Sequence, residues 1–106
     1  MEDSHELDTL ERVGTALADT TRRQILLQLT TGPTYPAELA DRLGVGRTNI
    51  SNHLTCLRGC GLVTATREGR QVRYDLASPE LAQALLELAG LALTVDHAHE
   101  DLDGRA

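Results

Sequence analysis

The residues of this sequence best suited to chemistry are two cysteines. Cys56 and Cys60 stand four residues apart in a segment with helical spacing, so both sulfurs would lie on one face and could approach one ion. Thiolates prefer soft or borderline ions such as Cd²⁺, Pb²⁺, Zn²⁺ or Cu⁺. Spacing alone leaves two other interpretations open. The pair could be small buried hydrophobic residues, or a thiol redox switch in which Gly59 and Gly61 let the helix end distort to close a disulfide.

The cysteines belong to a helix, expected from about Arg47 to Arg58, that carries a second set of useful side chains. Ile50, Leu54 and Leu57 recur at helical spacing and form its core stripe. Another stripe is polar and almost uncharged, and short hydrogen-bonding side chains of this kind suit base edges and phosphates in a major groove. The predicted DNA-contacting residues of this stripe and its flanks are Arg47, Thr48, Asn49, Ser51 and Asn52, with Thr55 on the same side.

The charge distribution agrees with a polyanionic partner although the chain is acidic. The formal net charge is −6, but acids crowd the two ends. Between residues 46 and 74 five arginines stand against one glutamate, a local charge of +4. Strand-like segments at 62–67 and 70–76 flank Glu68-Gly69 and predict a hairpin, which would place two or three contacts on the DNA backbone or minor groove. The residues expected to make them are Arg67, Arg70, Gln71 and Arg73.

The remaining elements are predicted to be helices around this unit. Helical spacing covers 7–18, a helix follows the N-cap candidate Asp19, and Pro36 opens a short helix that ends before a Gly-Val-Gly turn. The whole is predicted to be one mainly α domain over 1–106 with a β-hairpin, a winged helix-turn-helix. Its helix-turn-helix spans 36–59 and its wing 62–76.

The last helix, expected over 79–96, is apolar nearly all round and needs burial on more than one side. A thin aliphatic core in 106 residues offers little such burial, so this helix and the one at 7–18 are predicted to form a dimer interface. The interface candidates are Leu10, Leu81, Leu85, Leu88 and Ala92. A polar tail follows at 97–106.

Several classes of protein are excluded by the same sequence. No apolar run reaches the roughly 18–20 residues of a membrane span, and an acidic N-terminus differs from a secretory signal, so we expect a cytoplasmic protein. Two cysteines in that setting do not make a disulfide framework. No nucleophile is paired with a base and no Gly-rich phosphate loop is present, so we expect no enzyme. A winged-helix module that binds protein remains an alternative, which a steep salt dependence of duplex binding would exclude.

Several segments resemble the ArsR/SmtB family of bacterial repressors over about residues 7–95. The stretch from Ala16 to Ile25-Leu26 is similar to the family's N-terminal signature, Glu38-Leu39-Ala40 with residues 50–54 and 61–63 to its helix-turn-helix, and residues 69–74 to its wing. The resemblance implies a homodimeric repressor that binds an inverted-repeat operator and leaves it when an inducer, usually a metal ion, binds.

Residues 51–63 are similar to the recognition helix of a cadmium- and lead-sensing type of this family. That likeness implies that Cys56 and Cys60 are both ligands and that a third thiolate comes from the tail of the other subunit. This chain has no third cysteine. The corresponding position falls at about Asp101, with His97 and His99 nearby, and His5 is a further candidate. A Cys₂His or Cys₂Asp site is harder than Cys₃, which favours Zn²⁺ over Pb²⁺ and leaves Cd²⁺ open.

Two other metal sites of the family do not fit, and one histidine has several interpretations. Cysteines near Glu38-Leu39 are missing, and Ala84 and Leu86 occupy the first half of the last-helix zinc motif. His53 shares the face of Cys56 and Cys60, which makes it a geometric ligand candidate. The resemblance makes it part of the helix-turn-helix framework, and we include it among the DNA-binding candidates.

Overall fold

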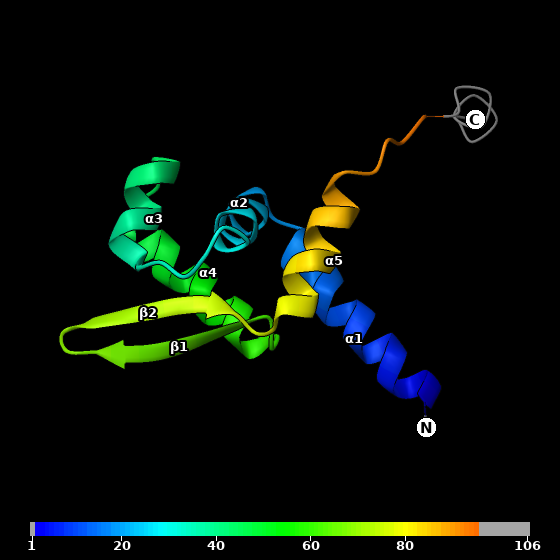
Figure 1. Ribbon diagram of the computed structural model, residues 1–106, viewed down its shortest axis with the longest axis horizontal. Helices are drawn as coiled ribbons and strands as arrows, with labels where there is room; N and C mark the ends of the chain where they lie inside the picture. Colours follow the sequence, from blue (N-terminus) through cyan, green and yellow to red (C-terminus); the bar gives the residue numbers. More distant parts are fainter. Residues whose placement is uncertain (1, 96–106) are drawn as a thin grey trace.

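A computed structural model describes residues 2–95 of the chain. Five helices and one antiparallel hairpin make up this part, and their arrangement confirms the predicted mainly α fold with a wing (Figure 1). The elements in chain order are α1 (Glu2–Leu17), α2 (Thr20–Leu29), α3 (Pro36–Leu43), α4 (Arg47–Gly59), β1 (Val63–Glu68), β2 (Gln71–Leu76) and α5 (Pro79–Ala89).

Local signals in the sequence fix most helix ends. The Asp19 side chain accepts a hydrogen bond from the Arg22 backbone N–H at 3.0 Å and so caps α2. Ser78 caps α5 in the same way, accepting from Leu81 N–H at 3.1 Å. Gly44 ends α3 with a φ of 67°, a left-handed conformation that glycine adopts without strain. These three ends set the turn that joins α3 to α4 and the entry into α2 and α5.

The core lies where α2, α3 and α4 meet the base of the wing. Ile50, Leu54 and Leu57, the predicted core stripe of α4, are fully buried. They pack in one cluster with Ile25 and Leu26 of α2. Other buried members come from every element of the described chain: Ala16, Leu29, Leu39, Ala40, Leu62, Val63, Leu76 and Leu85. The buried apolar side of α4 therefore anchors this helix, the candidate recognition helix, to the core.

The wing is a two-stranded ribbon that projects from this core (Figure 1). Its register runs from Val63 opposite Leu76 at the base to Glu68 opposite Gln71 at the tip, and Gly69 turns the chain with a φ of 62°. Thr34, just before α3, forms an isolated antiparallel bridge with Tyr74. The base of the hairpin is thereby joined on both sides to the helical body.

Two element bounds differ from the expected ones by more than one residue. α1 begins at Glu2 and not at residue 7, because the acidic residues that precede Leu7 suit a helix N-terminus. α5 ends at Ala89, well before residue 96, and residues 91–95 are exposed and lie outside any helix. Gly90 follows Ala89 directly, and glycine is a poor helix former. Within residues 2–95 no helix has the length and apolarity that crossing a membrane requires.

Candidate DNA-contacting surface and thiol pair

The polar stripe of α4 is on the molecular surface. Arg47, Thr48 and Asn49 at the start of the helix are exposed, as are Ser51 and Asn52 one turn later. Thr55 is exposed too, and its hydroxyl donates to the Ser51 carbonyl at 3.0 Å. The structure therefore leaves the whole predicted reading stripe free to meet a partner, while the opposite stripe anchors the helix.

The start of α4 and the tip of the wing border the same hollow. This open depression of about 450 Å³ is lined by Arg47 and Ser51 from α4 and by Arg70 and Gln71 from the wing. Residues 35–37, Val72 and Tyr74 form the rest of its wall. The structure thus brings together side chains 19 to 24 positions apart in sequence that were predicted separately to contact DNA.

The other two wing arginines make contacts inside the hairpin. Arg73 forms an ion pair with Glu68, with Nη1 and Oε2 3.2 Å apart. Arg67 is exposed and donates to the Gly69 carbonyl at 3.4 Å. Arg70, at the tip, has no hydrogen-bond partner among the described residues, so of the three it is the most available to a phosphate.

Cys56, on a third face of α4, and Cys60, the C-cap residue that follows the helix, are free, half-buried thiols. Burial raises the pKa of the Cys60 thiol, and the neighbouring Cys56 thiol adds to this. The positive charges of Arg12 and Arg22 act in the opposite direction. Arg12 also reaches from α1 to the end of α4, where its Nη1 donates to the Gly59 carbonyl at 3.4 Å. The two sulfurs therefore lie close to each other and close to α1.

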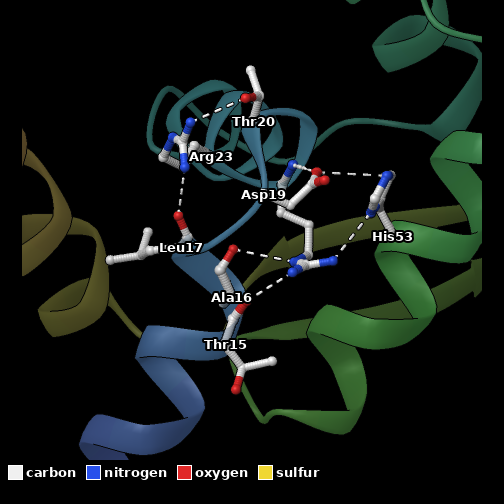
Figure 2. A network of polar contacts seen from close by, with 8 residues as sticks. Thr15, Ala16, Leu17, Asp19, Thr20, Arg23 and His53 are labelled. Atoms are coloured by element: carbon white, nitrogen blue, oxygen red, sulfur yellow. Dashed lines mark hydrogen bonds and ion pairs between the residues drawn. The ribbon is translucent and has the colours of Figure 1, made fainter.

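His53 lies on the thiol face but points into the junction of α1 and α2 (Figure 2). Its Nδ1 is 3.5 Å from Arg22 Nη1, and its Nε2 is 3.6 Å from the Asp19 carboxylate. Arg22 in turn donates to the carbonyls of Thr15 at 2.8 Å and Ala16 at 3.2 Å. Both ring nitrogens of His53 face polar groups of the α1–α2 junction, which fits the framework interpretation.

The bridging role of Arg22 is a feature that the sequence analysis missed. It comes from α2 and joins the last turn of α1 to α4, and it is also close enough to Cys60 to affect that thiol. The only signal in the sequence is Arg22 three residues after the N-cap Asp19, which does not by itself indicate a partner 31 residues away.

The interface candidates fall into two groups. Leu10 and Leu88 are 66% and 51% exposed, and Ala92 is exposed beyond the end of α5. Leu81 is half-buried, and Leu85 is only 7% exposed because it packs into the core of its own chain. The prediction treated Leu85 and Leu88 alike, whereas a single chain already buries the first and leaves the second open.

The described residues hold no complete metal site. No group of three or more His, Cys, Asp or Glu side chains comes together within residues 2–95. His5 is exposed on α1, and the tail candidates His97, His99 and Asp101 lie outside the described residues. Any third donor to the thiol pair must therefore come from the tail, from another chain or from a rearrangement.

Winged helix-turn-helix geometry with an exposed polar helix is that of a DNA-binding transcription regulator, and comparison with known proteins places the chain in one family. Residues 19–65 match the profile of the bacterial regulatory proteins of the arsR family. The chain is 61% identical over 87 residues to the HTH-type transcriptional regulator CmtR of Mycobacterium tuberculosis, across 82% of this chain and 74% of the relative. The chain belongs to the ArsR family, which consists of regulators and not of enzymes.

Other similar proteins are also transcription regulators or DNA-binding domains. A probable mercury resistance operon repressor of Streptomyces lividans is 36% identical, over 86% of this chain and 71% of that protein. The NMR structure of the cadmium metal-sensor CmtR from M. tuberculosis superposes with a TM-score of 0.67 at 60% identity, covering 81% of this chain and 90% of that one. A homodimeric winged helix-turn-helix DNA-binding domain from Mycobacterium bovis gives a TM-score of 0.77 at 33% identity, covering 95% and 88%.

Proposed function

We propose that this chain is a homodimeric, metal-responsive repressor. Its metal-free dimer binds an inverted-repeat operator with two copies of α4 in successive major grooves, about one helical turn apart. Coordination of a metal ion by the thiolates of Cys56 and Cys60 releases the dimer from DNA. The likeness to a protein whose structure is described as a cadmium metal-sensor supports this proposal.

The observation that carries the proposal is the position of the thiol pair on the recognition helix itself. At about 100° per residue, Cys56 and Cys60 fall between the reading stripe around Ser51 and the core stripe around Leu54. Coordination there leaves the base-contacting side chains in place. It acts on the end of α4 that Arg12 links to α1, one to two turns after His53, which Arg22 contacts, and can therefore change the angle of the helix.

The donor set fits a soft or borderline divalent ion. Two thiolates supply the soft ligands, and we propose that His97, His99 or Asp101 of the tail completes the site. Such a set favours Zn²⁺ or Cd²⁺ over Pb²⁺. Because the pKa of Cys60 is raised, coordination must displace a proton from this thiol. Apparent metal affinity should therefore increase as the pH rises toward that pKa.

Release from DNA requires that the metal-bound conformer binds the operator more weakly. A ligand shifts an equilibrium only by its difference in affinity for the two states, and a coupling of roughly 1–3 kcal/mol is the usual size. The chain supplies what such a difference needs: a helix fixed on its apolar side, held at its thiol end by Arg12 and contacted at its middle residue His53 by Arg22.

The experiment begins by selecting a bound duplex from a random pool and titrating the complex with Zn²⁺, Cd²⁺, Pb²⁺, Co²⁺ and Ni²⁺. Thiolate absorption and DNA binding are followed together. Cys56→Ser and Cys60→Ser should each bind the selected duplex normally and no longer release it. His53→Gln is the control, because it removes no thiol and its amide can still accept from Arg22 and donate to Asp19, so this variant should still release DNA with metal.

The remaining ligands and the redox alternative are separated in the same assay. Changing His97 and His99 together should weaken metal binding less than either cysteine variant, since Asp101 remains. Truncation after Val95 should abolish release while the thiol pair still takes up metal loosely. Peroxide instead of metal tests disulfide formation between Cys56 and Cys60, which two free neighbouring thiols make chemically feasible. The metal proposal fails if the double cysteine variant dissociates at the same metal concentration as the parent.

A further inference from the structure

Tyr35 lies outside both the helix-turn-helix and the wing, yet it contacts the wing near its tip. Thr34 pairs with Tyr74, with backbone hydrogen bonds of 3.0 and 2.8 Å in the two directions. The chain before α3 therefore runs along the outer edge of β2 for a short stretch, like a third strand. Successive residues of a strand point to opposite faces. The half-buried Tyr35 thus faces the same side of the ribbon as Arg73, the residue before Tyr74.

A single carboxylate joins these side chains. The Tyr35 hydroxyl donates to Glu68 Oε1 at 2.7 Å, and Arg73 Nη1 is 3.2 Å from Glu68 Oε2. The acceptor carboxylate raises the pKa of Tyr35, so the phenol stays a donor at neutral pH. Glu68 is the last residue of β1, Arg73 belongs to β2, and Tyr35 comes from the body of the domain. The three residues therefore form a clamp across the ribbon.

The outer half of the wing has little else to hold it. Val63 and Leu76 at the base are buried, whereas positions 66–71 are all exposed. An isolated two-stranded ribbon is marginally stable in water. Among the described residues, the hydrogen bond from Tyr35 to Glu68 is the only side-chain hydrogen bond that joins positions 66–71 to the helical body. Arg70 and Gln71, at that tip, border the hollow that they share with Arg47 and Ser51 of α4.

We propose that Tyr35 is a positioning residue for DNA binding: through Glu68 it fixes the wing so that Arg70 faces the same hollow as the start of α4. This inference rests on the proposed binding of DNA. The proposal also explains why a glutamate is present at position 68, close to the proposed DNA contacts. An acid on a DNA-facing wing repels phosphate, but this one holds Arg73 on one oxygen and the domain body on the other.

Glu68→Gln and Glu68→Ala provide a test in which charge is matched. Both remove the same negative charge, so electrostatics alone predicts equal strengthening of binding to a random-sequence 30-base-pair duplex. Glutamine keeps an acceptor oxygen for Tyr35, and alanine does not. We expect the glutamine variant to bind this duplex about fivefold more tightly than the alanine variant, and the difference to vanish when Tyr35→Phe is added. Equal binding of the two single variants overturns the inference.

Tyr35→Phe tests the route through Arg70. It should weaken binding to the same duplex roughly five- to tenfold and reduce the slope of log affinity against log salt by about 0.9 per wing, as loss of one phosphate contact does. Arg70→Ala should do the same, and the double variant should be no worse than Arg70→Ala alone. Multiplying losses would show that Tyr35 acts elsewhere and would contradict the proposal.

Thr64→Val is the control, because it removes an exposed hydroxyl near the base of the wing that has no hydrogen-bond partner among the described residues and does not line the hollow. Its loss should leave affinity and salt slope unchanged. Thermal unfolding of each variant shows that the fold is retained. A parent protein that binds no duplex would defeat the proposed function itself. A parent that binds, with Tyr35→Phe binding equally well, would defeat only the clamp.

Discussion

The two halves of this molecule differ in how completely one chain can bury its apolar side chains. Around α2, α3, α4 and the wing base the core is closed, and Ile50, Leu54 and Leu57 have no exposed surface. Along α1, α5 and the segment after α5 the opposite holds. Several large aliphatic side chains there are 49–85% exposed: Leu7, Leu10, Leu86, Leu88, Leu91, Leu93 and Val95.

This difference indicates that one chain completes the half around α4 and the base of the wing, the closed half, whereas the half formed by α1, α5 and the segment after α5 stays unfinished. Apolar side chains gathered on one side of a small protein mark an interaction site. Leu88 also borders an apolar depression with Leu17, Leu26 and Leu27, next to the exposed α1 face. A second copy of the chain would cover these helices and would set the distance between two α4 helices, which one chain cannot do.

The largest loss of DNA affinity should follow from a substitution that disrupts the proposed dimer contact in the unfinished half. Leu88→Glu would place an unpaired charge in the proposed dimer contact while leaving the protomer core intact, since Leu88 is 51% exposed. A monomer presents one reading helix and loses the gain from two linked sites, which is about 10²–10⁴-fold. Affinity for the selected inverted repeat, measured beside sedimentation, should fall by that order.

Gln83→Glu is the charge-matched control for this variant, because Gln83 is exposed on the same helix and its amide donates to Glu87, so the like-charge pair that replaces this bond costs only about 0.2–0.5 kcal/mol. It should remain dimeric and bind normally. If Leu88→Glu sediments as a dimer with full affinity, the interface lies elsewhere, and the exposed apolar side chains of α1 and α5 do not mark the dimer contact.

The second effect concerns the closed half. Leu54→Ala deletes a fully buried side chain from the α4 stripe and should lower the free energy of unfolding by about 2–5 kcal/mol. The loss should be the same at low and high protein concentration, because no partner contributes to this core. Leu10→Ala should instead change stability only where the dimer is populated, which denaturation at several concentrations would reveal.

Much of the closed half could be predicted from sequence because its signals are local. The spacing of Ile50, Leu54 and Leu57 gave the buried side of α4, and Asp19 gave the start of α2. The unfinished half carries weaker signals. A helix that is apolar nearly all round has no polar face to show which side is inward, so Leu85 and Leu88 could not be told apart.

Long-range polar contacts were beyond the sequence for a different reason. Tyr35 and Glu68 are 33 positions apart in the sequence, and Arg22 and His53 are 31 apart. The periodicity of a single helix or strand gives no indication that residues so far apart are in contact. Tyrosine and glutamate are ordinary surface residues, so nothing about their types indicates a partner. Only the bridge between Thr34 and Tyr74 brings the first pair together, and that bridge has no sequence signature.

A smaller effect separates two kinds of contact within the closed half. Ser51→Ala should cost on the order of 1–3 kcal/mol for the selected operator and little for random duplex, because a base contact is lost. Arg70→Ala should weaken binding to both and flatten the salt dependence, since a phosphate contact releases counterions without reading bases. Equal losses on both duplexes for both variants would contradict this division of roles between α4 and the wing.

The smallest effect should come from the junction where the two halves meet. Hydrogen bonding from the Arg22 backbone N–H lowers the pKa of the Asp19 carboxyl, and the nearby His53 and Arg22 side chains act in the same direction. Because the pKa of Asp19 is lower in the folded state, its ionised carboxylate stabilises the fold at pH values above the unfolded-state pKa, near 3.8. This contribution is lost as the pH falls through the folded-state pKa.

Asp19→Asn keeps a side-chain oxygen for the cap but has no charge to lose. The parent should therefore be the more stable of the two near neutral pH, and the two unfolding curves should converge in strong acid. Chemical denaturation from pH 7 downward measures the difference directly. A constant offset at every pH would mean that Asp19 acts only as a neutral cap and that its charge does not join α2 to α4.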